Sequence, residues 1–257
     1  MGGVKKFFRR ECQTSNFALE HDSVADFYLS CWQRNRSTLA LLFLRTIIFA
    51  GCLSIWVASM ALSGDMFSNL GYWFIFMTHW GLMFNTAASG LALVVSARAF
   101  FQEASFELPW YVKGYWLSYN VAVPIAFFIT LFYWSLLTDY GDQYAMDPVL
   151  DVFIHGVNSI LMLALVLVAR HPTRLLHFYC LKFICFLIFV HSFGTRYIYP
   201  MIDWDEPGKT AGLVIGCAVG FILLHAFLVA ITVCRDKLTQ RYRETNTMNV
   251  SDDERYN

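Results

Sequence analysis

Four polar side chains stand in apolar stretches of the sequence and are of types that support nucleophilic chemistry. Thr78 offers a hydroxyl, His155 and His191 offer imidazoles, and Asn158 follows His155 in the stretch IHGVNSILM. At 3.6 residues per turn, His155 and Asn158 share one helix face. A threonine becomes a nucleophile when a base takes its proton, and histidine is the usual base near neutral pH. These residues predict a site that could cleave an ester.

Each of these residues also has a purely structural explanation. Thr78 could bond the carbonyl of Phe74 in its own helix, and Asn158 could join two helices. Either histidine could be a neutral hydrogen-bonding partner inside a helix bundle. We expect all four side chains at a similar depth in one half of the bilayer, with Thr78 about 12 Å below the surface. A shared depth is a condition for the four to line a common pocket. No close histidine pair and no carboxylate is expected there, so the sequence predicts no metal site and no cofactor.

The segments that carry these residues are long enough to cross a bilayer. The 257 residues are 57% hydrophobic and 15% charged, whereas soluble domains have roughly 25% charged residues. A span needs about 20 apolar residues. Such runs occur at 38–62, 70–95, 115–138, 149–169, 175–195 and 210–234. The sequence predicts an all-α bundle of six transmembrane helices with short loops, in the plasma membrane or the endoplasmic reticulum.

The charge distribution predicts the orientation of this bundle. With six spans both termini share one side, where Lys and Arg gather, whereas only Arg196 and Lys209 flank the opposite ends. Both termini are therefore expected to be cytoplasmic, in segments 1–37 and 235–257. We expect residues 244–257 to lack ordered structure because they have little to bury. The net charge is zero, which excludes the basic surface that nucleic-acid binding requires.

Two further features concern packing. Gly212, Gly216 and Gly220 recur at four-residue spacing, a pattern that lets another helix approach closely. Arg45 lies about one-third into the first span, so we expect its guanidinium to extend to lipid phosphates.

Several segments resemble the rolling stone family of membrane proteins. In order they are FYLSCWQ (27–33), WFIFMTHWG (73–81), YNVAVPIAFFITLFYW (119–134), HGVNSILM (155–162) and RHPTRLLHFY (170–179). The resemblance covers roughly residues 27–235 and all six predicted spans. It implies a developmental role, in cell fusion such as myoblast fusion or in muscle and tissue differentiation.

The rolling stone proteins are in turn distantly similar to the androgen-induced lipid hydrolases, which cleave fatty acid esters of hydroxy fatty acids with a threonine. That similarity implies Thr78 as nucleophile and matches His191, Tyr199 and Pro200 to the family's last element. The chain differs from these hydrolases at their HGxH element: its HGVN keeps His155 but has Asn158 at the position of the family's base. An amide cannot accept a proton at neutral pH, so catalysis would need His155 or His191.

The sequence leaves two main functions open. The first is a rolling-stone-like integral membrane protein with a structural or cell-surface role. The second is an intramembrane lipid esterase that uses Thr78 with His155 or His191. A transporter is a third reading, but no span carries a buried acid for ion coupling and no inverted repeat is visible. The expected partners are membrane lipids, with a fatty acid ester as substrate in the second reading, and a helix on the glycine ridge.

Overall fold

The computed structural model describes residues 2–33, 37–62, 73–101, 108–138, 147–179, 199 and 202–253. Five helical segments in these ranges are long and apolar enough to cross a membrane. They are α2 (Leu39–Leu62), α4 (Met77–Phe101), α5 (Trp110–Phe132) extended by the π-helix Tyr133–Leu137, the run of α6 (Pro148–Val152), π-helix Phe153–Val157 and α7 (Asn158–Val168), and α9 (Pro207–Asp253). The predicted all-α class is confirmed.

The remaining predicted span, 175–195, lies mostly outside the described residues. Its first part, Leu175–Tyr179, forms a 3-10 helix, and residues 180–195 are among those not described. The N-terminal region adds α1 (Gly2–Glu11) and two 3-10 turns at Thr14–Phe17 and Val24–Phe27.

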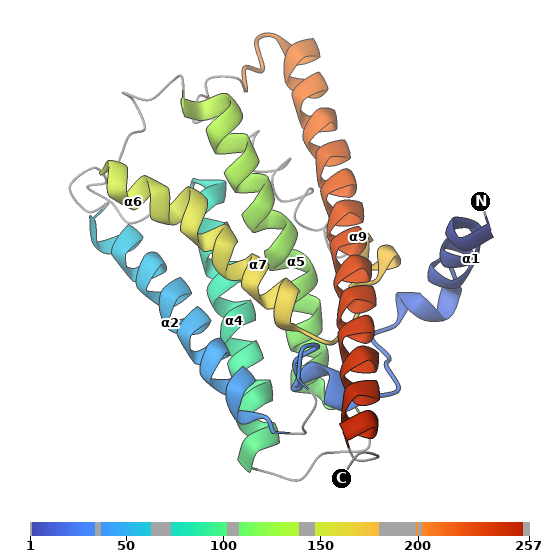
Figure 1. The fold of residues 1–257 in the computed structure, drawn as a ribbon. Helices are drawn as coiled ribbons and strands as arrows, with labels where there is room; N and C mark the ends of the chain where they lie inside the picture. Colours follow the sequence, from blue (N-terminus) through green and yellow to red (C-terminus); the bar gives the residue numbers. More distant parts are fainter. Residues whose placement is uncertain are drawn as a thin grey trace.

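The long helices form one bundle in which α4 packs between α2 and α5 (Figure 1). The α6–α7 run crosses α2 and α5, and α9 packs against α5 and α7. Two ends of the bundle matter for function. The Arg45 end holds the starts of α2 and α5 and the ends of α4 and α7. The His155 end holds the end of α2, the start of α4 and the start of α6.

One helix begins later than the sequence predicted. We expected a span from residue 70, but α4 begins at Met77. The Met77 backbone N–H donates to the Tyr199 hydroxyl at 3.0 Å, so a side chain from a distant segment satisfies this free helix-end donor. Thr78 is therefore the second residue of α4 rather than a residue about 12 Å inside a helix, and its expected depth was wrong.

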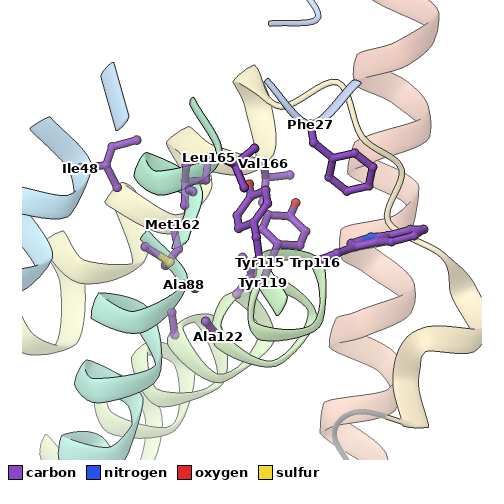
Figure 2. Packing of buried hydrophobic residues seen from close by; sticks show 14 of the residues in the cluster. Phe27, Ile48, Ala88, Tyr115, Trp116, Tyr119, Ala122, Met162, Leu165 and Val166 are labelled. Carbon is purple, nitrogen blue, oxygen red and sulfur yellow. The ribbon is translucent and has the colours of Figure 1, made fainter. Parts of the chain in front are cut away.

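The core consists of apolar layers between these helices (Figure 2). Tyr115, Trp116 and Tyr119 of α5 are almost fully buried. They belong to a large cluster with members from every long helix, among them Ile48, Cys52, Ala88, Met162, Leu165 and Leu228. A second cluster, nearer the His155 end, contains Ile55, Leu82, Leu150 and Ile154.

The N-terminal segment docks onto the Arg45 end of the bundle. Phe27 is fully buried and its ring stacks on His171, with centroids 5.1 Å apart. Asp26 forms an ion pair with Arg170 at 2.9 Å, and the Cys31 N–H donates to the Val168 carbonyl at 3.1 Å. This docking was not predicted, because the segment's few apolar residues are scattered among polar ones.

The other end of the chain is helical farther than expected. Helix α9 continues through Asp253, into the tail for which we expected no ordered structure, because extending a helix costs less than starting one. On α9, a Cβ added at Gly212 or Gly216 would meet no described atom within 4 Å, and one at Gly220 would lie 3.9 Å from Phe128. The glycine ridge as a contact with another helix stays a prediction.

Candidate functional site

His155 lies in a π-helical turn and is held by two neighbours. Its Nδ1–H donates to the Asp151 carbonyl at 3.2 Å, and the Asp151 carboxylate lies 3.6 Å from the same nitrogen. Its ring stacks on the Tyr133 ring at 3.5 Å, and the Tyr133 hydroxyl donates to Asp151 at 3.1 Å. Because a carbonyl only accepts, this arrangement places the proton on Nδ1 and leaves Nε2 able to accept a proton.

His79 on the facing helix has the same arrangement. Its Nδ1–H donates to the Trp73 carbonyl at 2.5 Å, and its ring stacks on the Trp73 ring at 4.2 Å. Helix α4 packs against the π-helix that carries His155. No described residue forms a hydrogen bond to Nε2 of either ring. Two potential bases therefore lie near each other at the His155 end.

Thr78 is half-buried beside this pair. Among the described residues, none forms a hydrogen bond with its side chain, so the expected bond to the Phe74 carbonyl is absent. Neither a hydrogen bond nor an ion pair joins Thr78 to His155 in the described ranges. The hydroxyl of Tyr199 reaches the N–H of Met77, the residue before Thr78. His191 and Pro200 lie outside the described residues, so their predicted role stays a prediction.

Asn158 lies one turn deeper than His155 and is 2% exposed. Its side-chain oxygen is buried and has no hydrogen-bond partner in the described structure. Within the described ranges, this oxygen neither joins two helices nor bonds the Asp151–His155 pair.

The His155 end contains a candidate nucleophile, Thr78, and a base of fixed orientation, His155. The backbone carbonyl of Asp151 holds the imidazole by its Nδ1–H and leaves Nε2 able to act as a base; in Ser-His-Asp enzymes a carboxylate holds the imidazole in this way. The sequence reading missed Asp151, which lies in the predicted span 149–169 and is 8% exposed, so its expectation that no span carries a buried acid was wrong. Asp151 stands four residues before His155, a spacing that brings side chains together on a helix and could have revealed it. The described residues contain no group of three or more His, Cys, Asp or Glu side chains able to hold a metal ion.

The π-helical turns were a second feature that sequence reasoning missed. Tyr133–Leu137 and Phe153–Val157 are both π-helical, and the stacked pair Tyr133 and His155 joins them. Such turns are rare and occur often at functional sites. The HGVN motif owes the placement of its histidine to one of them.

A separate polar cluster occupies the Arg45 end. Arg45 is 1% exposed, and its guanidinium donates to the Ala92 carbonyl at 3.1 Å, Ser96 Oγ at 2.8 Å and the Tyr115 hydroxyl at 3.4 Å. The expectation that it extends to lipid phosphates was wrong. Its place near a helix end suited that interpretation, but neighbours on α4 and α5 accept from its Nη1 and Nη2 nitrogens inside the bundle.

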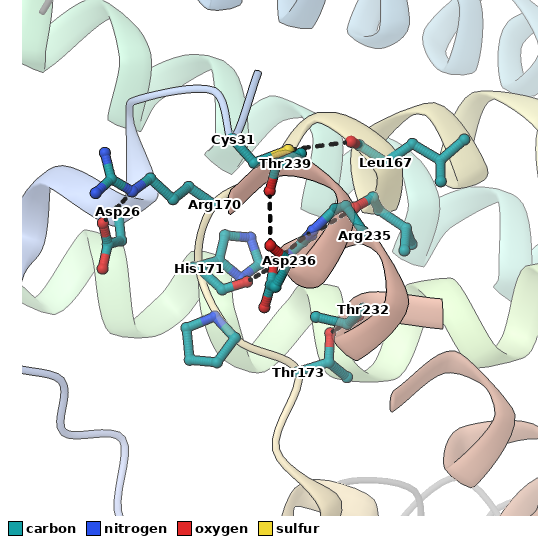
Figure 3. Close-up of polar contacts among 12 residues, drawn as sticks. Asp26, Cys31, Leu167, Arg170, His171, Thr173, Thr232, Arg235, Asp236 and Thr239 are labelled. Atoms are coloured by element: carbon teal, nitrogen blue, oxygen red, sulfur yellow. Dashed lines mark hydrogen bonds and ion pairs between the residues drawn. The ribbon is translucent and has the colours of Figure 1, made fainter. Parts of the chain in front are cut away.

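His171 links Arg45 to a second buried arginine. Its Nε2 accepts from the Tyr115 hydroxyl at 2.9 Å, and its carbonyl accepts from Arg235, which also bonds the Val166 carbonyl at 2.6 Å and Asp236 at 2.7 Å (Figure 3). Burial, with the nearby charges of Arg45 and Arg235, holds the pKa of His171 well below its ordinary value. This cluster holds the loop after α7 against α2, α5 and α9.

Five apolar helices of spanning length, with polar clusters buried between them, fit a multi-pass integral membrane protein. The family model described as "Protein rolling stone" matches residues 2–247, so the chain belongs to the rolling stone family. It is 28% identical over 248 residues to protein rolling stone of Drosophila melanogaster, and the match covers 88% of each chain. No solved structure matches this chain.

Proposed function

We propose that this protein is a rolling-stone-type membrane protein that acts in cell fusion or tissue differentiation, with both termini cytoplasmic. The observation that carries the proposal is the family match over residues 2–247. The fold supports it, because the polar cluster at the Arg45 end includes His171, on which Phe27 of the N-terminal segment stacks, and this suits a stable platform in a plasma membrane.

The test is depletion and rescue in fusing myoblasts of the source organism. Depletion is expected to lower the fraction of nuclei in multinucleate cells, and the wild-type chain should restore it. Rescue by Thr78→Ala in the same cells decides whether the role needs chemistry at that hydroxyl. Normal fusion after complete depletion would contradict the proposal.

A second candidate function is intramembrane hydrolysis of a lipid ester, such as a fatty acid ester of a hydroxy fatty acid. The specific observation in its favour is the Asp151–His155 pair, which leaves Nε2 of His155 unprotonated beside the start of α4. Thr78 Oγ would attack the ester carbonyl carbon while Nε2 takes its proton. Nε2 would then give that proton to the departing alkoxide, and water would hydrolyse the acyl-threonine.

Hydrolysis by purified protein in detergent tests this candidate, with an active family hydrolase as control. Thr78→Ala should abolish turnover, and His155→Ala should lower it at least about 100-fold, the low end for losing a general base. Asn158→Ala should cost less, because an amide there can only orient a group. Thr46→Ala is the matched control, since Thr46 bonds the Leu42 carbonyl on an exposed helix face.

Two outcomes separate a lost activity from a different mechanism. An inert but folded wild type that gains turnover as Asn158→His would show that the asparagine has replaced the working base. Turnover unchanged in Thr78→Ala would eliminate the threonine mechanism.

A further inference from the structure

Helix α4 ends at the Arg45 end of the bundle (Figure 1), and a groove follows its last two turns. The volume of the groove is about 300 Å³, and Val94, Ala97, Arg98 and Phe101 line it. These residues are spaced three and four apart, so they share one face of the helix. Ligand pockets usually measure about 300–1,000 Å³, so the groove is large enough for part of a small molecule.

The walls of the groove are apolar side chains that face outward from the bundle. Val94 is 43% and Phe101 is 78% exposed, whereas Ala92, Val95 and Ser96 on the opposite face of the same helix are buried. Because α4 is one of the helices long and apolar enough to cross a membrane, its outward apolar side chains contact lipid. The groove therefore opens toward the lipid bilayer.

The depth of the groove matches the headgroup region of that bilayer. Arg98 lies three residues before Phe101, where α4 ends, which is about 5 Å along the helix axis. Trp110, the first residue of α5, is 81% exposed, and tryptophans gather where hydrocarbon meets headgroups. Arg98 thus lies near the level of lipid phosphates, and Val94 lies about 6 Å deeper, in the hydrocarbon.

Arg98 is the only charged side chain among the described residues that line the groove. It is exposed, and its guanidinium carbon lies 5.7 Å from the centroid of the Tyr111 ring on α5. This cation–π contact engages the flat face of the guanidinium, whereas the N–H donors lie in the plane of the group. Two of these donors, side by side, match the oxygens of a phosphate.

The combination of one guanidinium with apolar walls selects a class of ligand. A soluble anion would use Arg98 but leave the apolar walls uncovered, and a neutral lipid would cover the walls but not pair with the guanidinium. A phospholipid has both parts, because glycerol joins its phosphate to the acyl chains. An anionic headgroup fits better than a zwitterionic one, since the latter would bring a second cation close to Arg98.

We propose that this groove binds an anionic phospholipid, whose phosphate pairs with Arg98 and whose acyl chain lies along Val94, Ala97 and Phe101. The site is separate from the His155 end and needs no chemistry at Thr78, so it does not depend on whether the protein hydrolyses esters. It is also independent of the orientation of the bundle, because both leaflets of a membrane carry lipid phosphates.

The test is photolabelling of the full-length protein in phosphatidylcholine nanodiscs that contain a small share of photoactivatable phosphatidylglycerol. Labelling should map to residues 94–101 of α4. Unlabelled phosphatidylglycerol should compete with it. Diacylglycerol, which lacks the phosphate, and inorganic phosphate, which lacks the acyl chains, should not compete.

Two variants separate the arginine from the groove. Arg98→Gln should lower labelling of α4 about tenfold, the order expected for the loss of one charge-assisted contact. Ala97→Phe keeps the arginine but fills the groove, and it should lower labelling to a similar degree. Lys237→Gln is the matched control, because Lys237 is an exposed cation on α9, and it should label like wild type. Melting temperatures in detergent show that each variant is folded.

Three results would overturn the proposal. Equal competition by diacylglycerol would show that α4 contacts lipid through its apolar side chains alone, and this readout on wild type needs no variant to fold. Unchanged labelling of Arg98→Gln would show that the arginine does not hold the phosphate. Labelling lost in Arg98→Gln but kept in Ala97→Phe would show that Arg98 meets lipid phosphates without a groove.

Discussion

The two ends of the bundle bury polar groups in opposite ways. At the Arg45 end, a guanidinium, a phenol and an imidazole bond one another and nearby carbonyls in a continuous network. Toward the His155 end, Asn85 and Asn158 are equally buried but keep unpartnered atoms, and Thr78 forms no described side-chain hydrogen bond. The first end holds segments together through side chains that bond one another, although Arg45 Nε and His171 Nδ1 have no partner among the described residues. The two amides toward the second end form no such network.

This difference shows why a polar residue in a span is a poor guide to function by itself. Arg45 carries the most expensive group to bury, yet its neighbours make it structural. Asn158 carries no charge, yet its side-chain oxygen has no partner among the described residues. The partners of a side chain, more than its type, show which residues hold segments together.

The largest expected effect comes from breaking the network at the Arg45 end. Arg45→Met keeps much of the side-chain volume but removes the donor to Ser96 Oγ, and a buried polar group left unpaired costs about 1–3 kcal/mol. With further bonds lost to the Ala92 carbonyl and the Tyr115 hydroxyl, the melting temperature in detergent should fall by about 5 °C or more. Arg98→Met, at an exposed residue of the same end, should change it far less. Equal losses in both variants would remove the special role of the network.

The next largest effect is a pH dependence of stability that arises from His171 at the Arg45 end. The folded protein holds His171 neutral because burial and nearby charges lower its pKa, whereas the unfolded chain binds a proton as the pH falls below about 6.5. The contribution of neutral His171 to the free energy of unfolding is therefore fully present above about pH 6.5. Below that pH the free energy of unfolding falls by up to about 1.4 kcal/mol per pH unit. Melting temperatures of wild type and His171→Phe between about pH 8 and 5 test this. Parallel curves would show that His171 contributes nothing.

The smallest effect is expected at the His155 end. Tyr133→Phe keeps the ring that stacks on His155 but removes the hydroxyl that donates to Asp151, a bond to a charged group worth about 1.5–3 kcal/mol when fully buried. Because Tyr133 is only partly buried, a drop of about 2 °C in melting temperature is the expected result. Any hydrolytic activity should fall as well, since Asp151 holds the imidazole. A loss as large as that of Arg45→Met would mean that this end is equally structural.

Hydropathy alone was enough to predict the class of fold and the bounds of two of the long helices. The spans expected at 38–62 and 149–169 agree with Leu39–Leu62 and Pro148–Val168 within one residue, because apolar runs of this length have few alternatives to a spanning helix. The start of α4 was missed by seven residues, since the bond from Met77 to Tyr199 involves a residue over a hundred positions away.

The candidate site was only partly predictable. His155 and Asn158 were found because they are polar residues in an apolar run, and Asp151 was missed because it stood near the expected helix end. Asn85 and Thr86 were overlooked as common polar residues. Their burial depends on how α2, α4 and α7 pack, which hydropathy does not reveal.

The most direct test of the contrast between the two ends is an experimental density map of the protein in a lipid nanodisc at a resolution that shows ordered lipids. We predict that the map will show Arg45 bonded to Ala92, Ser96 and Tyr115, and will show Asn85 and Asn158 outside any such side-chain network. A map in which the two amides bond each other with nothing between them, or in which Arg45 instead contacts a lipid phosphate, would contradict the account.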